Sequence, residues 1–438
     1  MRVSSVATMR EGGRVAAAIE VLDEIFARHR PASEALKDWG RAHRFAGAGD
    51  RHAIGTLVYD VLRRKASLAA RMASGSARAL ALAALHDVWR RPPDAIAGAV
   101  ADEHGPGPLT PDERRALAAE PRADLPAHVA GDYPDWLAGS FARAFGERAA
   151  EEGRALARRA PVDLRANILK CDRPRLLKAL EKFGAAPGPL SPWCVRIEAP
   201  DPERRGPHVE AEPAHGKGWF EVQDAASQVA ALMSGARAGE QVADICAGAG
   251  GKTLALAALM GNKGQIHAYD ADRHRLRPIF ERLQRAGARN VQVLGADEAA
   301  RLDQLAGKID CVVVDAPCSG SGAWRRNPDA KWRLTERQLR QRQAGQEAVL
   351  ARGAGLVKPG GRLLYVTCSV LPEENDDQVQ AFLRSHPGFA AMPYRDQWRR
   401  AIGTEPPASA GQAGDTLLLT PHAHATDGFF VALLRKVA

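Results

Sequence analysis

The sequence predicts an α/β protein: a doubly wound parallel sheet in its C-terminal half, a small α/β module before it, and an all-α N-terminal region. From about residue 216, short apolar runs rich in β-branched residues alternate with helical patterns, which is typical of a parallel sheet covered by helices on both faces. Residues 129–215 contain a strand–helix–strand pattern, and residues 1–128 show helical periodicity. We therefore expect three domains, with limits 1–128, 129–215 and 216–438.

Composition restricts the partners and the compartment. The chain has 438 residues and a net charge of +9, which suits an anionic partner such as nucleic acid. The six cysteines lack the spacing of metal ligands, which argues against a zinc site and against a disulfide scaffold. No apolar run reaches the roughly 18 residues that span a bilayer, and no secretory signal is evident. We expect a cytoplasmic monomer that uses neither a metal nor a membrane.

The N-terminal region should be helical. Arg14–Arg30 carries an apolar stripe at helical spacing, and a second helix follows from Ile54 and a third over Ala77–Trp89. The second helix ends in a run of basic residues, where cations suit the helix dipole. This run either contacts RNA or forms a solvated surface, and the sequence favours neither. Its members are Arg63, Arg64 and Lys65.

The middle module begins with a long amphipathic helix predicted over Asp135–Arg159. Asp163–Lys170 alternates like a strand, Pro174–Phe183 is helical, and Cys194–Glu198 is a second strand. A strand at Gly218–Asp224 and a helix after it should lead into the main domain.

In the main domain, five parallel strands and a terminal antiparallel pair are the layout of a Rossmann-like methyltransferase sheet. The parallel strands are expected at 241–246, 265–269, 291–294, 311–314 and 362–367, and the closing pair at 417–419 and 428–434. Helices are expected at 253–260, 273–286 and 335–357.

A glycine-rich loop follows the first of these strands, in the run Asp-Ile-Cys-Ala-Gly-Ala-Gly-Gly-Lys-Thr that ends at Thr253. A Walker A loop needs a glycine at Cys246 and a dinucleotide-binding loop needs one at Thr253, so both interpretations fail. An S-adenosylmethionine loop fits, because small residues let the backbone approach the cofactor and no phosphate has to be cradled. Acids at the ends of the next two strands, Asp270 and Asp297, would hold the ribose and the adenine.

Two thiols follow two other strands, in Asp315-Ala-Pro-Cys318 and in Thr-Cys368-Ser. Since the carboxyl ends of parallel strands share one edge of a sheet, both thiols should meet the methyl donor. Carbon 5 of cytosine becomes nucleophilic only after a thiolate adds to carbon 6, which is covalent catalysis. The attacking thiol needs a cationic or dipolar neighbour, for which Lys252 and the loop N–H groups are candidates.

These motifs together resemble the RsmB/Nop/Sun family of RNA cytosine-5 methyltransferases over at least residues 130–438. The signatures include the two loops above, Arg326-Asn-Pro-Asp, Thr367-Cys-Ser-Val-Leu-Pro-Glu-Glu-Asn and Thr426-Asp-Gly-Phe-Phe. The resemblance implies that Cys368 is the nucleophile, that Cys318 assists proton removal and product release, and that Asp315 and Lys252 hold the cytosine. It also implies a set of residues that bind S-adenosylmethionine. That set is Cys246, Ala247, Gly248, Ala249, Gly250, Gly251, Lys252, Asp270, Asp297 and Asp315.

The resemblance extends to the substrate. The helical region is similar to the NusB-like RNA-binding domain of the ribosomal-RNA branch, which favours 16S rRNA over tRNA as substrate. A basic segment after Cys318 would border the target base, with Trp324 or Trp332 stacked on a base, or else form a solvated basic helix with its tryptophans in the core. Two alternatives stay open: the two thiols exchange roles, or the chain is a non-catalytic RNA-binding assembly factor. The basic residues are Arg325, Arg326, Lys331, Arg333, Arg337, Arg340 and Arg342.

Overall fold

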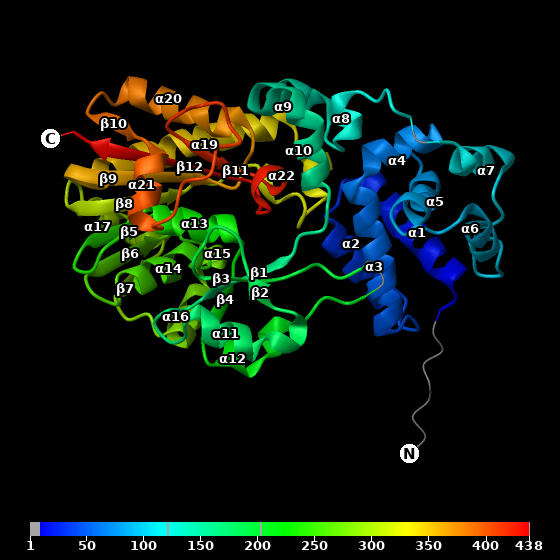
Figure 1. Cartoon of the computed structure of the whole chain (residues 1–438), viewed down its shortest axis with the longest axis horizontal. Helices are drawn as coiled ribbons and strands as arrows, with labels where there is room; N and C mark the ends of the chain where they lie inside the picture. Colours follow the sequence, from blue (N-terminus) through cyan, green and yellow to red (C-terminus); the bar gives the residue numbers. More distant parts are fainter. Residues whose placement is uncertain (1–8, 121, 202–203, 438) are drawn as a thin grey trace, which may run out of the picture.

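The computed structural model describes residues 9–120, 122–201 and 204–437. Its N-terminal part is a helical bundle beside the rest of the chain (Figure 1). The helices expected near 14–30, 54–65 and 77–89 are confirmed as α1, α3 and α5, and their buried apolar residues form one core. The bundle consists of α1 (Glu11–Arg28), α2 (Ala32–Ala42), α3 (Ala48–Arg63), α4 (Lys65–Met72), α5 (Ala77–Asp87), α6 (Pro93–Val100) and α7 (Pro111–Ala118).

The prediction of one long helix over 135–159 is wrong. After α8 (Ala127–Ala130), the chain forms the short turns η1 (Asp135–Leu137) and η2 (Gly146–Arg148), which alternate with α9 (Ala138–Phe145) and α10 (Ala149–Leu156). The break falls at Gly146, whose φ of 59° and ψ of −130° lie outside the helical region and suit a residue without a side chain. Periodicity alone missed it because the apolar stripe continues on both sides of the glycine.

A small antiparallel sheet follows, in the order β2-β3-β1-β4, with α11 (Arg173–Ala179) and α12 (Pro213–Gly216) packed on it. Its fourth strand corrects the sequence interpretation, which placed that strand in the main domain. Leu164 is paired with Val222 in this sheet, and Phe220 is buried in its core. The strands are β1 (Val162–Ala166), β2 (Ala186–Pro187), β3 (Cys194–Ile197) and β4 (Phe220–Val222).

The main sheet has the order β10-β12-β9-β8-β5-β6-β7, and β11 pairs with β12. The five predicted strands β5 to β9 are parallel, and β11 and β12 are antiparallel to each other, as expected. The strand β12 is also antiparallel to β9. Sequence patterns missed β10, a short edge strand. The strands are β5 (Gln241–Asp244), β6 (Gln265–Tyr269), β7 (Val291–Leu294), β8 (Ile309–Asp315), β9 (Val357–Thr367), β10 (Phe389–Met392), β11 (Leu417–Leu419) and β12 (Phe429–Lys436).

Helices cover both faces of this sheet. One core includes α13 (Ala225–Met233), α14 (Gly251–Leu259) and α21 (Tyr394–Ala401). The other includes α9, α19 (Glu336–Leu356) and α20 (Asp376–Ser385). The helix predicted over 273–286 is divided at Pro278 into α15 (Arg273–Leu276) and α16 (Ile279–Ala286), because proline lacks the N–H that continues a helix. Short helices α17 (Ala299–Asp303) and α22 (Pro421–His424) complete the domain.

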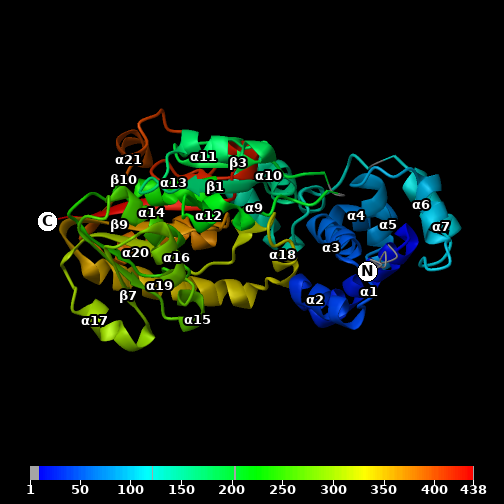
Figure 2. The same ribbon diagram turned by 90° about the horizontal axis from the view of Figure 1, so that it is seen from below.

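The basic segment after Cys318 connects the two large domains instead of lining an open surface. Lys331, in α18 (Ala330–Arg333), is 1% exposed and donates from Nζ to the carbonyl oxygens of Arg63 and Asp132, both at 2.6 Å. Trp332 Nε1 donates to the Leu62 carbonyl at 2.6 Å. Figure 2 shows α18 between the helical bundle and the sheet domain.

The expectation that this segment borders the target base is therefore wrong for several of its members. Trp324 is 1% exposed and stacks on Phe141 in the core. The guanidinium groups of Arg325 and Arg326 form ion pairs with Asp224 and Asp427. The side chains that stay exposed are on α19: Arg337, Arg340 and Arg342.

The buried ammonium of Lys331 should make stability depend on pH. Burial lowers its pKa from 10.5 to about 7, and nearby Arg63 and Arg64 act in the same direction against Asp132. Between those two pH values the unfolded chain holds more protons than the folded chain, so the free energy of unfolding rises with pH, by up to about 1.4 kcal/mol per unit. We expect Lys331→Met to lose this slope when unfolding is followed from pH 6.5 to 10.

The matched control for that measurement is Lys308→Met, because Lys308 is exposed and its Nζ donates to the carbonyl of Gln304 in the turn between α17 and β8. It should keep the slope of the wild-type protein. Parallel pH profiles for the wild type and Lys331→Met would contradict the assignment of the slope to Lys331.

Candidate active site

The two thiols meet at the carboxyl edge of the main sheet. β8 ends at Asp315 and β9 at Thr367, and these neighbouring parallel strands deliver Cys318 and Cys368 to the same rim. The two Sγ atoms are 3.4 Å apart, and both side chains are half-buried. An acid and two thiols are therefore brought together, as the strand ends predict.

Two glycines fix how closely the loops approach. The Gly322 N–H donates to the Cys368 carbonyl at 2.9 Å, and the Gly428 N–H donates to the Gly322 carbonyl at 2.9 Å. A Cβ on Gly322 would clash with the Gly428 carbonyl oxygen, so this position requires a residue without a side chain. The contact ties the Cys318 loop to Cys368 and to the start of β12.

Lys252 and Asp315 form an ion pair beside the thiols. Nζ of Lys252 is 2.7 Å from Oδ2 of Asp315 and 3.4 Å from Oγ of Ser227, and it lies over the ring of Phe429 at 5.1 Å. The lysine side chain is 5% exposed, whereas that of Asp315 is 34% exposed. The recorded contacts of Lys252 are thus with a carboxylate, a hydroxyl and a ring, and not with a thiol.

The loop Cys246–Lys252 lies over the end of β5. Gly248 and Gly250 have φ of 51° and 83°, so the turn depends on residues without a side chain. Asp270, at the end of β6, is 4% exposed and accepts the N–H groups of Gly248 and Asp272, each at 2.8 Å. A narrow loop of small residues with carboxylates on both neighbouring strands suits a cofactor with a polar sugar.

Asp297 lies apart from this arrangement of buried groups. Its side chain is 63% exposed and forms a 2.7 Å ion pair with Arg273. The expected contact with adenine stays a prediction.

Electrostatics distinguish several groups of the site. The pKa of the Cys318 thiol is raised well above 9.0. The largest cause is the hydrogen bond between Cys318 and Cys368, and burial and the charge of Glu374 act in the same direction. Burial raises the pKa of Asp244 to about 7, although Thr253 donates to it at 2.7 Å. Burial also raises the pKa of the Cys246 thiol, which makes it an unsuitable nucleophile.

Sequence patterns missed the groups that support the thiols and the ion pair. Ser227 contacts Lys252, and its hydroxyl also accepts from Gln223 Nε2 at 3.1 Å. Glu374 and Asn375 lie behind the two thiol loops. A signal was present, because Glu374 and Asn375 are in the Leu-Pro-Glu-Glu-Asn signature, but chain order alone does not tell what a residue contacts.

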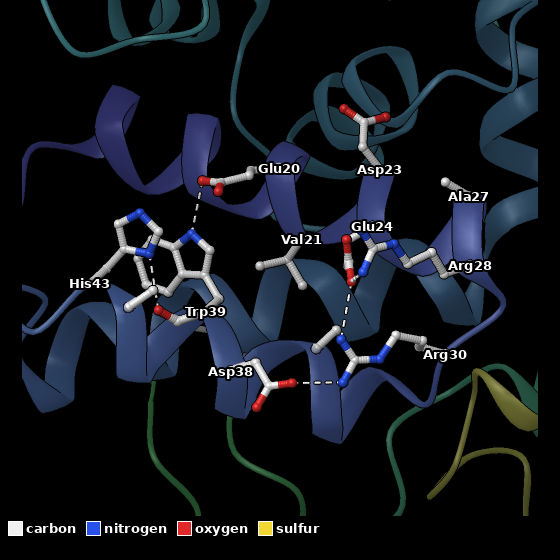
Figure 3. A pocket seen from close by; sticks show the side chains of 12 residues that line it. Glu20, Val21, Asp23, Glu24, Ala27, Arg28, Arg30, Asp38, Trp39 and His43 are labelled. Atoms are coloured by element: carbon white, nitrogen blue, oxygen red, sulfur yellow. Dashed lines mark hydrogen bonds and ion pairs between the residues drawn. The ribbon is translucent and has the colours of Figure 1, made fainter.

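A separate hollow lies in the helical bundle, between α1 and α2 (Figure 3). Its polar groups are paired with one another: Trp39 Nε1 donates to Glu20 at 2.9 Å, and Arg30 contacts Glu24 and Asp38 at 3.0 and 2.6 Å. It lacks the thiols and the loop described above, so we assign it no chemistry.

Within the ranges that the structure describes, no helix is long and apolar enough to cross a membrane. Among the same residues there is no group of three or more His, Cys, Asp or Glu side chains that could hold a metal ion.

A parallel sheet with an antiparallel strand β12 beside β9, and a glycine-rich loop after β5, define a Rossmann-like methyltransferase fold. The family pattern described as 16S rRNA methyltransferase RsmB/F matches residues 231–435, and a second, the RsmF/B-like ferredoxin-like domain, matches residues 133–202. The chain belongs to the RsmB/F family of methyltransferases.

Named relatives agree with this assignment. The chain is 34% identical over 312 residues to the probable ribosomal RNA small subunit methyltransferase B of Synechocystis sp., covering 69% of this chain and 67% of that protein. It is 34% identical over 308 residues to the ribosomal RNA small subunit methyltransferase B of Klebsiella pneumoniae, covering 69% and 66%. The chain thus spans about two thirds of the length of these relatives.

Solved structures extend the similarity. The crystal structure of PH0851 has a TM-score of 0.72 and 25% identity, and covers 98% of this chain and 100% of its own. A methyltransferase homologue from Pyrococcus horikoshii has a TM-score of 0.59 and 29% identity, and covers 71% of this chain and 98% of its own. The limits of the three domains and the NusB-like character of the first stay predictions.

Proposed function

We propose that this protein is an S-adenosylmethionine-dependent RNA cytosine-5 methyltransferase that acts on 16S rRNA. The observation that carries the proposal is the pair of thiols 3.4 Å apart, beside the Lys252–Asp315 ion pair, at the rim of a methyltransferase sheet. A methyltransferase acting on an exocyclic nitrogen has no use for two adjacent thiols, whereas carbon 5 of cytosine requires a covalent nucleophile.

Cys368 starts the reaction. Its thiolate, formed by loss of the thiol proton to solvent, adds to carbon 6 of the cytosine, and the electron pair of the 5,6 double bond becomes available at carbon 5. S-adenosylmethionine, which the loop Cys246–Lys252, Asp270, Asp297 and Asp315 would hold, would supply an electrophilic methyl group to that carbon and leave as the neutral thioether. Lys252 and Asp315 hold the ring so that carbon 6 faces the sulfur of Cys368.

Cys318 then completes the reaction. In the free enzyme its hydrogen bond with Cys368 is the largest cause that raises the pKa of Cys318, so Cys318 keeps its proton while Cys368 attacks. Once Cys368 is bonded to carbon, that cause is removed. Burial and the charge of Glu374 still raise the pKa of Cys318, so its thiolate forms as a minor species by loss of the thiol proton to solvent. The resulting thiolate takes the carbon-5 proton, the 5,6 double bond re-forms, and Cys368 leaves as a thiolate.

The substrate class rests on the relatives, which are named as methyltransferases of the ribosomal small subunit. The net charge of +9 fits an RNA partner. The cytoplasm, where rRNA is made and reduced thiols persist, is the compartment that this chemistry needs.

Mapping of 5-methylcytosine tests the proposal. Bisulfite sequencing of total RNA should show one or a few 16S rRNA cytosines that lose methylation when the gene is deleted. Wild-type protein should restore them and Cys368→Ala should not. A lost signal in tRNA instead would change the substrate, and an unchanged RNA profile together with no transfer of labelled methyl groups to RNA would favour the non-catalytic assembly factor.

A further inference from the structure

Two consecutive residues behind the thiols have no part in the chemistry above. Glu374 ends the turn η7 (Pro372–Glu374), and Asn375 follows it directly before α20. Both side chains are buried, with exposed fractions of 0% and 1%. A buried carboxylate is costly unless several donors satisfy it, so its partners indicate what it is for.

The carboxylate of Glu374 holds both residues that flank Cys318. Oε1 accepts the Ser319 N–H at 2.8 Å, and Oε2 accepts the Ser319 hydroxyl. Gln346 Nε2 donates to the same Oε1 and to the Pro317 carbonyl, each at 3.0 Å. Pro317 and Ser319 are thus tied to one carboxylate, directly on one side of the thiol and through Gln346 on the other.

The amide of Asn375 does the same for Cys368. Its Nδ2 donates to the Ser369 carbonyl at 3.0 Å, and its Oδ1 accepts the Thr367 hydroxyl at 2.6 Å. Thr367 and Ser369 are the residues on either side of Cys368. Glu374 and Asn375 therefore each contact the residues on both sides of one thiol, directly or through Gln346, and a single peptide bond joins the two residues.

We propose that Glu374 and Asn375 are positioning residues that set the separation of the two thiols, Glu374 for Cys318 and Asn375 for Cys368. Because one peptide unit joins the two residues, a shift of one loop against the other must change that unit or break one of the contacts of Glu374 and Asn375. The inference rests on the proposed function and deepens it, because each positioning residue should govern the step of its own thiol. Loss of Glu374 should impair release, and loss of Asn375 should impair attack.

The test compares Glu374→Ala, Asn375→Ala and Glu373→Ala in the full chain, with a 16S rRNA transcript and S-adenosylmethionine. Glu373 is a matched control, because it is the adjacent acid but its carboxylate contacts Ser140 and Arg143 on α9. Methyl transfer gives turnover, and the protein–RNA complex that survives detergent gives the amount of covalent adduct.

We expect Glu374→Ala to lose about tenfold or more in turnover while its adduct rises about fivefold or more above wild type. Asn375→Ala should lose both signals, and Glu373→Ala should match wild type. Glu374→Gln should regain part of the turnover, since its amide oxygen can still accept the Ser319 N–H. An adduct forms only on folded enzyme, so accumulation cannot come from misfolding.

A Glu374→Ala protein that loses turnover and adduct together overturns the inference, as does one that equals wild type in both. If that variant does not fold, Ser319→Ala, which removes the hydroxyl contact alone, must show the same split to a smaller degree. If the wild-type protein transfers no methyl group, and neither it nor any variant forms an adduct with RNA, the proposed function is overturned as well. This outcome differs from the one that overturns the inference alone.

Discussion

Replacing Cys368 by alanine should abolish methyl transfer, with a loss of about four orders of magnitude or more, because in the proposed order Cys368 is the thiol that adds to carbon 6 and so activates carbon 5. The variant should form no detergent-stable complex with RNA. Cys318→Ala should also lose turnover but should accumulate that complex, since attack is intact and release is not. Labelled methyl transfer and gel shift under denaturing conditions measure the two quantities.

The control is Cys171→Ala, which removes a thiol from the core of the small sheet and should keep turnover near wild type. An adduct that forms with Cys368→Ala and is lost with Cys318→Ala would reverse the two roles. The 3.4 Å contact between the sulfurs is compatible with either order, so this experiment decides between them.

Breaking the Lys252–Asp315 pair should have the next largest effect. We expect Lys252→Met to lower kcat/KM by about a hundredfold to a thousandfold, because it removes a base-holding group and leaves a carboxylate unpaired beside the ring. Asp315→Asn should do the same. The double variant should be little worse than either single one, because both changes remove one interaction.

The same strand provides the control for this prediction. Asp310, near the start of β8, forms an ion pair with Lys358 on β9, away from the thiols at the other end of these strands. Lys358→Met should leave kcat/KM within about twofold of wild type, as is usual for an exposed ion pair. Equal losses from Lys358→Met and Lys252→Met would mean that general damage to the sheet domain, and not ring binding, explains the result.

The sequence was sufficient for the parallel strands of the main sheet, because buried parallel strands are short apolar runs with turn residues at both ends. The sequence also predicted that Cys318 and Cys368 lie close together, because the carboxyl ends of parallel strands share one edge of the sheet. It was not sufficient for Lys331 or Trp324, since a basic run and two tryptophans have the same appearance whether they face RNA or another domain. The Glu374 and Asn375 contacts depend on how two loops fold over one turn, which no spacing rule describes.

The burial of Lys331 and Trp332 against the helical bundle also bears on inheritance. Lys331 and Trp332, which follow the Cys318 loop closely in the chain, cover part of the surface of a different domain. Each domain would therefore expose this contact surface to water without the other. If recombination exchanged the first domain for an unrelated one, the ammonium of Lys331 and the indole of Trp332 would lose their carbonyl acceptors in that domain and become exposed to water. The acceptors are backbone carbonyls, so the side chains of Leu62 and Arg63 can change while the path of this backbone must be kept, and the two domains should therefore have diverged as a unit.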